Sequence, residues 1–450
     1  MSTIQKSGDY VVRNSQNRIV MDMSHISSNE FIDICRKNNS HKFIRNRKLP
    51  LKDFLLSMIN REGLSLALEL RNFMKIMHPG ESISKPGYLK QRMKLNPEAF
   101  RELYHFHSKN FYNNSNYKTY KDYLILAADG SNINVPRTEE NLETFGTSSR
   151  HESKPQPALG LGCIYDVLNK FILESECGRG KFNELVCAEL QLKELHYTIG
   201  DIPYIIIMDR GYPSLPAFIH MQDHAIPYIF RVKDCDFKEE RKHMKTDDEV
   251  IDIVITKSRL RHYIGSEDGA RMQELGKITL RIVNIKIDDK TTETLFTNLP
   301  ADKFERKDLK ELYCMRWGIE TAFETLKSRL QLENFTGTKP VIILQDIYST
   351  IYISNIAEDI ILECERELEL NDPSHFKHQM KINQSLSIGM LKNDLIYILI
   401  EKNISRRNIL FQDLYNEIQK NLVPARPDRH YKRTKGQLAG RYSNTYKKLY

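Results

Sequence analysis

Two aspartates in this 450-residue chain directly follow short apolar runs. Asp129 follows the run 123–128 and begins the triplet Asp-Gly-Ser, and Asp209 follows the run 204–208 and begins Asp-Arg-Gly-Tyr. Short, bounded apolar runs are typical of buried strands, and open α/β sheets carry their sites just past the carboxyl ends of such strands. Each aspartate alone is more often a turn residue. The pair indicates a functional site only together with a third group.

A third carboxylate lies in a predicted amphipathic helix over about 305–331. The polar stripe of this helix consists of Tyr313, Arg316, Glu320 and Lys327. At about 100° per residue these side chains fall within about 60° of one another, beside an apolar arc that docks on a core. The alternative is a solvated helix face on which Arg316 and Glu320 form an i,i+4 pair worth about 0.2–0.5 kcal/mol.

Two strand-end aspartates and a glutamate on a nearby helix can together hold two divalent cations. Carboxylate oxygens select Mg²⁺ or Mn²⁺, and in a two-metal site one ion activates a water or a 3′-OH while the other stabilises the leaving oxygen. Arg316 and Lys327 would neutralise the phosphates on either side of the scissile bond. We therefore predict that Asp129, Asp209 and Glu320 are the catalytic, metal-binding residues of an enzyme that acts on phosphodiesters.

The spacing Tyr-x2-Arg-x3-Glu-x6-Lys, from Tyr313 to Lys327, resembles the Y-R-E-K signature of the DDE transposases of insertion-sequence family four. Glu320 fits the glutamate position, whereas Glu324 lies one turn too far along the helix. The likeness extends over roughly residues 40–440 and includes a helical N-terminal part, a β-rich insertion, the strand Phe296-Thr-Asn-Leu and a basic C-terminal tail.

The resemblance implies an RNase H-like catalytic core and Mg²⁺- or Mn²⁺-dependent endonuclease activity at the ends of an insertion sequence. A freed 3′-OH would attack the opposite strand to form a DNA hairpin, and resolution of the hairpin would precede strand transfer to a target. No separate nucleotide cofactor is implied. The expected partners are double-stranded DNA, as terminal inverted repeats and as target, and a second copy of the chain in a synaptic complex.

The resemblance also implies which residues contact DNA. The residues that hold the end phosphates beside a flipped base are Tyr313, Arg316 and Lys327. Trp317, the only tryptophan, could stack near the DNA or could lie at the edge of the core. Arg210 could reach a phosphate or brace a neighbouring acid. An aromatic residue of the insertion would complete the flipped-base pocket, and Tyr263 is a candidate.

The surrounding pattern predicts an α/β fold with an RNase H-like core, in which the runs before the two aspartates are separated by a hairpin with its turn at 166–170 and a helix over 183–195. Apolar residues at helical spacing over about 30–110 predict a helical N-terminal part, broken at Pro79-Gly80 and Pro86-Gly87. Later helices are predicted at about 341–370, 388–401 and 406–420.

The expected domain boundaries follow from these changes of pattern. They are a helical N-terminal DNA-binding domain (1–115), the first part of the core (120–233), a β-rich insertion (234–300), the core helix with the catalytic glutamate (301–335), C-terminal helices that could form a dimer interface (336–423) and a basic tail (424–450).

The positive charge of the chain is concentrated at its end. The net charge is +8, and residues 424–450 contain eight Lys or Arg and one Asp, which gives +7 there and +1 for residues 1–423. A second basic run, 36–52, contains seven Lys or Arg and no acid. Contact with a polyanion is one reading, with tyrosines of the tail as stacking groups, and a solvated chain end is the other.

Several classes of protein are disfavoured. The seven cysteines are scattered singly, so neither a zinc finger nor a disulfide framework is indicated. The N-terminus lacks an apolar signal region, and the greasy stretch 341–362 contains acids that a bilayer would penalise. We expect a cytoplasmic, DNA-associated bacterial or archaeal protein without membrane contact. A Gly-x-Ser-x-Gly elbow and a Gly-rich phosphate loop are both absent from the sequence.

Two rivals to the transposase remain. One is a nuclease with the same core that only hydrolyses, which would need neither the insertion nor the tail. The other is a DNA-binding protein descended from a transposase that no longer cuts, and the intact triad and stripe disfavour it.

Overall fold

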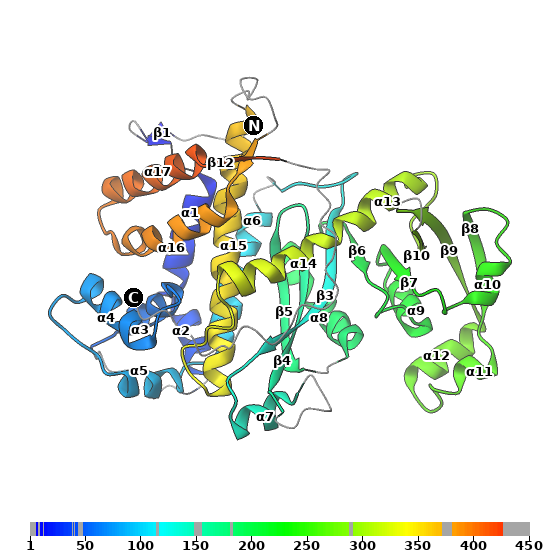
Figure 1. Ribbon diagram of the computed structural model, residues 1–450, viewed down its shortest axis with the longest axis horizontal. Helices are drawn as coiled ribbons and strands as arrows, with labels where there is room; N and C mark the ends of the chain where they lie inside the picture. Colours follow the sequence, from blue (N-terminus) through cyan, green and yellow to red (C-terminus); the bar gives the residue numbers. More distant parts are fainter. Residues whose placement is uncertain are drawn as a thin grey trace.

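Figure 1 shows the computed structural model of the chain, with the N-terminal and late helices at one end, a large sheet in the middle and the strands after residue 234 at the other end. It describes residues 6–425 except 8–9, 12, 38, 40, 44–47, 114–116, 148–154, 181–182, 288–290 and 371–379. Nearly all of the predicted basic tail and part of the basic run 36–52 therefore lie outside the described residues.

The N-terminal part is helical, as its apolar spacing predicts. Its elements are the strand pair β1 (Lys6–Ser7) and β2 (Tyr10–Val11), then α1 (Asn14–His25), α2 (Asn29–Arg36), α3 (Leu51–Ile59), α4 (Leu66–Met77), α5 (Lys85–Arg92) and α6 (Glu98–Tyr112). The break expected at Pro79-Gly80 is confirmed, because α4 ends at Met77. The break expected at Pro86-Gly87 is wrong. Pro86 lies in the first turn of α5, where its missing N–H costs no hydrogen bond, and Ser84 caps that turn.

One mixed sheet forms the centre of this α/β structure, with strand order β5-β4-β3-β6-β7-β10-β9-β8. Its strands are β3 (Leu124–Asn134), β4 (Ala158–Asp166), β5 (Phe171–Arg179), β6 (Tyr204–Met208), β7 (Tyr228–Val232), β8 (Asp248–Val254), β9 (Lys277–Lys286) and β10 (Thr292–Thr297). Strands β3, β6 and β7 run parallel, whereas β4 is antiparallel to both β3 and β5. The predicted hairpin with its turn at 166–170 is confirmed.

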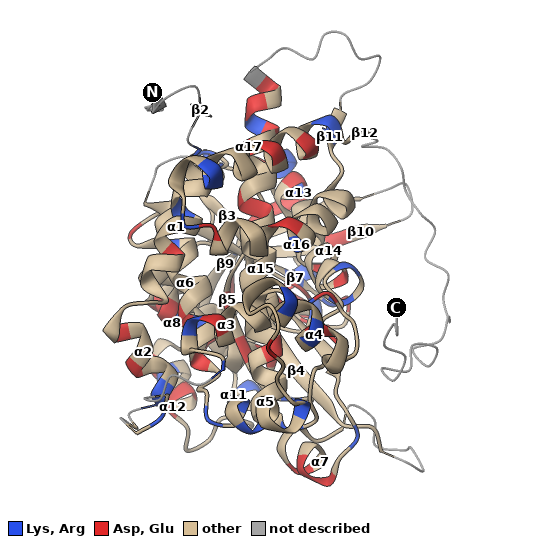
Figure 2. Ribbon diagram, turned by 90° about the vertical axis from the view of Figure 1, so that its left-hand side faces the viewer, with Lys and Arg blue, Asp and Glu red and all other residues tan. Residues whose placement is uncertain are grey.

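Helices cover both faces of this sheet, and the alternation along β3 separates the two sides. Leu126 and Ala128 pack in one hydrophobic cluster with α8 (Glu184–Ile199) and α9 (Leu215–Asp223). Ala127 packs in the other cluster, with the helices that follow residue 305. Because side chains alternate along a strand, the next odd residue, Asp129, is directed to the same face as Ala127. Beyond the sheet, the short α7 (Glu139–Phe145) carries the acidic residues at the bottom of Figure 2.

The segment between the second aspartate and Glu320 contains the expected strands, but it does not form a sheet of its own. Strand β10 pairs with β7 in antiparallel register, with Phe296 opposite Phe230, so β10, β9 and β8 extend the central sheet. The pairing covers an edge of β7 that would otherwise expose its backbone groups. The segment also contains α10 (Lys238–Lys242), α11 (Lys257–Leu260) and α12 (Glu267–Leu275), which are too short to give a periodic signal.

The late helices are α15 (Pro340–Leu370), α16 (Gln384–Ile400) and α17 (Ile404–Lys420), accompanied by the strand pair β11 (Met380–Ile382) and β12 (Leu422–Pro424). Their predicted positions are confirmed. Helix α15 packs against α1, α6, α17 and β5 of its own chain, and most of its described side chains are buried. Exposed apolar side chains lie instead on α16 and α17, among them Tyr397 and Ile404.

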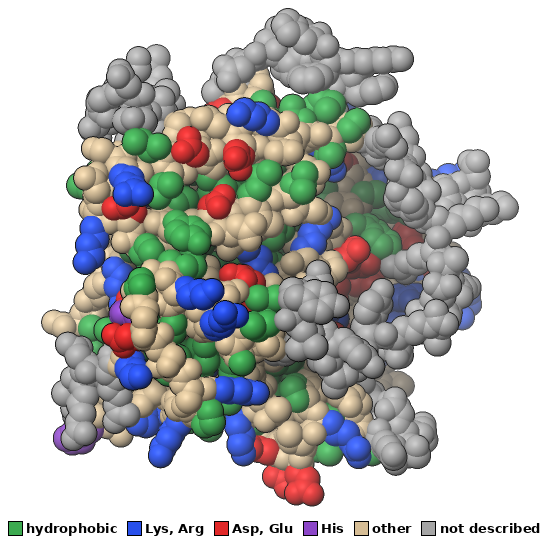
Figure 3. All heavy atoms as spheres, turned by 60° about the vertical axis from the view of Figure 1, so that its left-hand side comes forward, with side chains coloured by type: hydrophobic (Ala, Val, Ile, Leu, Met, Phe, Trp, Pro, Cys, Tyr) green, Lys and Arg blue, Asp and Glu red, His purple; other side chains and the backbone are tan. Residues whose placement is uncertain are grey.

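Figure 3 shows the left-hand side of Figure 1, where the N-terminal and late helices lie, and there basic and acidic side chains stand singly or in small groups among apolar ones. Over the described part of the chain, we find no helix with both the length and the apolar character needed to cross a bilayer.

A buried charged cluster joins α1, α6 and α15. His107 of α6 is fully buried, and its ring nitrogens lie 2.7 Å from Asp22 Oδ2 and 3.4 Å from Asp359 Oδ2. The Nε of Arg18 donates a hydrogen bond of 2.7 Å to the carboxylate of Asp359. Burial lowers the pKa of His107, but Asp22 and Asp359 outweigh it and raise that pKa to about 9. His107 is therefore a cation at neutral pH and binds two helices to a third.

This cluster predicts a loss of stability at alkaline pH. The folded pKa of His107 lies above the unfolded value of 6.5, so its stabilisation is complete below pH 6.5 and is lost as the pH rises towards 9, by at most about 3 kcal/mol. Urea unfolding at several pH values should show this fall in wild type and a much flatter profile in His107→Gln. His196→Gln, at a largely exposed position, should keep the wild-type profile. An unchanged slope in His107→Gln would refute the assignment.

Candidate active site

The two aspartates lie side by side on neighbouring parallel strands. Ala128 of β3 is paired with Met208 of β6, so the next residue on each strand is an aspartate at the same level of the sheet. Asp209 follows the end of β6, as predicted. Asp129 does not follow the end of β3, because β3 continues to Asn134 by pairing with β4, and Asp129 lies opposite Cys163. Strand β6 pairs with β3 only as far as Ala128, whereas β4 stays paired with β3 as far as Asn134. The edge of β3 that faces β6 is therefore open beside Asp129.

The third carboxylate is carried by a helical segment that crosses the molecule from the insertion to α15 (Figure 1). It consists of α13 (Arg306–Met315), α14 (Trp317–Glu324) and the π-helical turn η1 (Thr325–Arg329). The prediction of one regular helix over 305–331 is therefore only partly right. At Arg316 the backbone N–H bonds to Tyr313 O, three residues back, and the N–H of Leu330 bonds to Thr325 O, five residues back. Tight and wide turns of this kind are frequent at functional sites.

The guanidinium of Arg316 lies among the three candidate carboxylates. Only 3% of this side chain is exposed, its Nη2 donates a hydrogen bond of 2.9 Å to Glu320 Oε1, and its Nη1 lies 3.8 Å from Asp129 Oδ2. Burial lowers the pKa of Arg316, but the charges of Asp209 and Glu320 outweigh it, and the net shift is upward. The three acids and Arg316 thus form one electrostatic unit, which the structure brings together from three separate parts of the chain.

The surroundings of Asp129 raise the pKa of its carboxyl group. Burial raises its pKa to about 6, against a hydrogen bond of 2.8 Å that Oδ1 accepts from the N–H of Gly130 and against the nearby Arg316. The negative charges of Glu184 and Glu320 raise the pKa further. The hydrogen bond from Gly130 holds this carboxyl group in place. The nearby positive charge of Arg316 does not fully offset its burial and the two neighbouring acids.

Two residues of this site were missed by the sequence analysis. Arg231 of β7 lies 3.6 Å from Asp209 Oδ1 and forms an ion pair of 2.5 Å with Glu293. Its signal was a single cation inside the otherwise apolar run of β7. Glu184, the first residue of α8, contributes to the electrostatic environment of both Asp129 and Asp209. Its position at the start of a predicted helix looked like an ordinary favourable interaction with the helix dipole.

The remaining residues of the stripe are held by the sheet. Tyr313 is 5% exposed and lies close to Asp209 and Arg231, and burial raises its pKa. The ammonium group of Lys327 donates hydrogen bonds of 2.8 Å to Ser131 Oγ and to the carbonyl of Asn132 in the extension of β3. Burial lowers the pKa of Lys327. The stripe therefore faces the open edge of β3, not bulk solvent.

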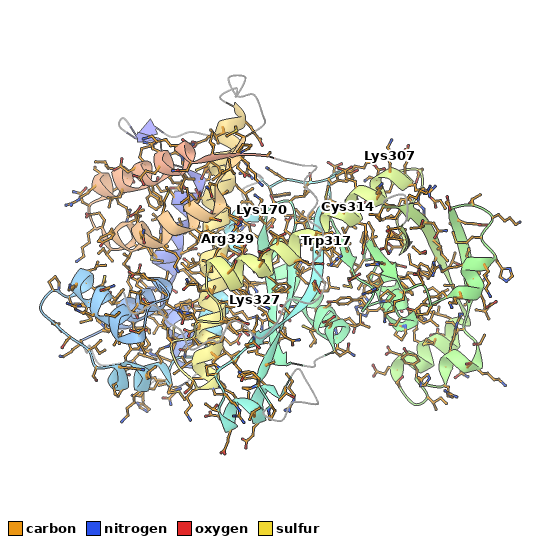
Figure 4. All side chains as sticks on the ribbon, viewed as in Figure 1. Lys170, Lys307, Cys314, Trp317, Lys327 and Arg329 are labelled. Atoms are coloured by element: carbon orange, nitrogen blue, oxygen red, sulfur yellow. The ribbon has the colours of Figure 1, made fainter. Side chains whose placement is uncertain are left out.

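The other candidate DNA contacts lie at the surface. Trp317 is 48% exposed, and the guanidinium of Arg316 lies 5.7 Å from the centre of its ring. Figure 4 shows Trp317 on the same helical segment as Lys327. Arg210 is exposed directly after Asp209. Tyr263 packs against the hydrophobic cluster of α9, β7 and β9, away from the signature helix.

The donor set fits a hard divalent cation. All three candidates are carboxylates, which Mg²⁺ and Mn²⁺ prefer, and Asp209 Oδ1 is buried without a hydrogen-bond partner among the described residues. In the present arrangement no three acidic, His or Cys side chains of the described residues converge closely enough to hold an ion. The guanidinium of Arg316 lies between Asp129 and Glu320.

Comparison with known proteins gives one match to a family of protein domains, the transposase DDE domain, over residues 120–356. Transposase InsG of insertion sequence element IS4 from Escherichia coli K12 is 22% identical over 433 residues, which cover 93% of this chain and 92% of that protein. The transposase of element IS231B from Bacillus thuringiensis is 22% identical over 313 residues, covering 67% of this chain and 60% of that protein.

Among solved structures, a piggyBac transposase synaptic complex with hairpin DNA aligns with a TM-score of 0.44 and 12% identity, over 91% of this chain and 87% of that one.

Proposed function

We propose a function from the family of this chain, which belongs to the DDE transposases. A relative that aligns over nearly its whole length is the transposase for insertion sequence element IS4. The proposed function is to excise and reinsert an insertion sequence of the IS4 kind by two-metal-ion cleavage, through a DNA hairpin. The observation that carries the proposal is the meeting of Asp129, Asp209 and Glu320 around the guanidinium of Arg316. The three carboxylates can bind divalent cations. The guanidinium of Arg316 can bind a DNA phosphate.

The strand order supports an RNase H-like core. Strands β5, β4 and β3 are antiparallel neighbours, and β6 and β7 add to β3 in parallel. The first aspartate lies on the central strand of this group and the second follows its parallel neighbour. The boundaries predicted at 120–233, 234–300 and 301–335 remain our proposal for the extent of the core and of the insertion that continues its sheet.

Each residue of the site has a part in the proposed reaction. Asp129, Asp209 and Glu320 hold two Mg²⁺ or Mn²⁺ ions, which when bound supply an activated water or 3′-OH and stabilise the leaving oxygen. Arg316 moves from Glu320 to a phosphate next to the scissile bond, where its planar fork can bind two oxygens. Tyr313 and Lys327 hold further phosphates of the transposon end, and exposed Trp317 offers its ring to a base.

The partners follow from the same proposal. They are double-stranded DNA, as terminal inverted repeats and as target, and a second copy of the chain that brings the other end. The helical N-terminal domain (1–115) and the basic tail (424–450) would bind DNA, with Arg210 as a further contact near Asp209. The exposed apolar residues of α16 and α17 are the better candidates for contact between copies. We place the protein inside a bacterial or archaeal cell, in association with DNA.

The proposal is tested by incubating the protein with a labelled duplex that carries the element's own ends and Mg²⁺. We expect nicks first, then hairpins that resolve, and joined products once target DNA is added. Nicks without hairpins or joining would favour the rival nuclease that only hydrolyses. Tight binding without any cleavage under Mg²⁺ or Mn²⁺ would favour the rival DNA-binding protein that no longer cuts.

Removing Lys327 should weaken DNA binding through the loss of a phosphate contact. In Lys327→Ala we expect the slope of log affinity against log salt concentration to fall in magnitude by about 0.9, since one fewer counterion is released. The loss should be the same for different end sequences. Fluorescence anisotropy at several salt concentrations measures both quantities. Lys193→Ala, exposed on α8, is the matched control and should keep the wild-type slope.

A further inference from the structure

A fourth carboxylate, that of Glu184, lies against the backbone next to the two candidate aspartates, on the opposite face of the sheet from Glu320. Glu184 is the first residue of α8, and the side chain of Asn183 caps the helix by accepting hydrogen bonds from the backbone N–H groups of Leu185 and Val186. This cap fixes the start of α8 beside the sheet. Helix α8 packs against β3, β4 and β5 on the face that Ala128 occupies, whereas Glu320 lies on the face of Ala127.

Two glycines next to the aspartates leave the space that this carboxylate fills. A Cβ added to Gly130, the residue after Asp129, would lie 3.0 Å from Glu184 Oε1. A Cβ added to Gly211, two residues after Asp209, would lie 3.5 Å from Glu184 Oε2. One oxygen therefore lies against each of the two backbone segments that carry the aspartates. The carboxylate spans the open edge between β3 and the loop after β6.

The charge of Glu184 is not compensated by the residues around it. Among the described residues no hydrogen bond donor or cation pairs with its side chain, although the chain places it near Asp129 and Asp209. Arg316 pairs with Glu320 and lies near Asp129, and Arg231 pairs with Glu293 and lies near Asp209. Holding like charges together costs folding free energy. Natural proteins keep such arrangements where function requires them.

Resting on the proposed two-metal site, we propose that Glu184 is a further ligand residue of that site, an additional hard oxygen donor to the cation shared by Asp129 and Asp209. Glu320 and Glu184 would then face the cations from the two faces of the sheet, and the small residues Gly130 and Gly211 would be required to keep the approach open.

The test is Mn²⁺ binding to the full-length protein, measured by isothermal titration calorimetry on its complex with a duplex carrying the element's ends. Glu184→Gln should weaken Mn²⁺ binding about 10- to 100-fold, the loss usual for groups that support a metal. Without metal the same variant should have an equal or higher midpoint of thermal unfolding, because it removes repulsion. Glu189→Gln, on the same helix and away from the aspartates, should bind Mn²⁺ like wild type.

The outcomes separate this inference from the proposed function. If Asp129→Asn weakens Mn²⁺ binding and Glu184→Gln leaves it within about twofold of wild type, Glu184 is no ligand and the inference is overturned while the two-metal site stands. A lower unfolding midpoint of Glu184→Gln without metal would likewise overturn it, because that result marks a structural role. If wild type binds no Mn²⁺, or Asp129→Asn binds it unchanged, the metal site itself fails.

Discussion

Neutralising any one of the three candidate catalytic carboxylates is expected to reduce cleavage of end-bearing DNA by about 10³-fold or more, while binding of that DNA is retained. The variants are Asp129→Asn, Asp209→Asn and Glu320→Gln, which keep the size of each side chain. The physical reason is that each carboxylate supplies oxygens and negative charge that hold the cations in line with the scissile bond. Single-turnover cleavage with Mg²⁺ measures the rate, and a gel-shift assay in Ca²⁺ measures binding.

The signature helix provides a matched control for this experiment. Glu324 is exposed one turn beyond Glu320, so Glu324→Gln changes the same chemistry at a position that faces solvent and should cleave within about threefold of wild type. Loss of activity in Glu324→Gln together with normal activity in Glu320→Gln would move the catalytic glutamate by one turn. Folding of every variant is checked by thermal unfolding, so that a loss of cleavage is not mistaken for a loss of structure.

The largest effect on stability is expected for Asp346→Ala, with a loss of about 3–5 kcal/mol in the free energy of unfolding. Asp346 of α15 is fully buried and forms ion pairs of 2.8 Å with Arg92 and 3.3 Å with Arg61. Its Oδ2 also accepts a hydrogen bond of 2.8 Å from the backbone N–H of Thr336. Removing the carboxylate leaves the buried guanidinium of Arg92 without its counter-charge. Urea unfolding of the full-length protein measures the loss.

An exposed pair of the same chemistry serves as the control. Asp223 and Arg271 form an ion pair of 2.7 Å with both side chains more than a third exposed, and Asp223→Ala should cost less than about 1 kcal/mol. The double variant Arg92→Met with Asp346→Leu should recover part of the lost stability, because it removes the buried charge of Arg92 together with the carboxylate, while Arg61 keeps the backbone carbonyls of Asp346 and Asn334 as acceptors. A loss below about 1 kcal/mol in Asp346→Ala would show that Arg92 finds another partner.

The site could be predicted from the sequence where local pattern decides the structure. The run 204–208 coincides with β6, so Asp209 lies where it was expected. The helical period predicts that Glu320 shares a face with Arg316, and the resemblance to the Y-R-E-K signature selects Glu320 over Glu324.

What the sequence did not reveal depends on contacts between distant segments. The length of β3 beyond Asp129 depends on its pairing with β4, about thirty residues later, and no local signal marks it. Arg231 becomes part of the site only because β7 pairs with β6. Glu184 joins it only because α8 packs beside Gly130. The break at Arg316 and the wide turn after it also resist a rule that assumes uniform helical geometry.

The pairing of β10 with β7 has a mechanical consequence. The segment inserted between Asp209 and Glu320 is not a separate domain on a flexible hinge. It is a rigid extension of the same hydrogen-bonded sheet whose strands carry the aspartates. The positions of its outer strands β8 and β9 relative to the aspartates are therefore set by the hydrogen bonds of the sheet.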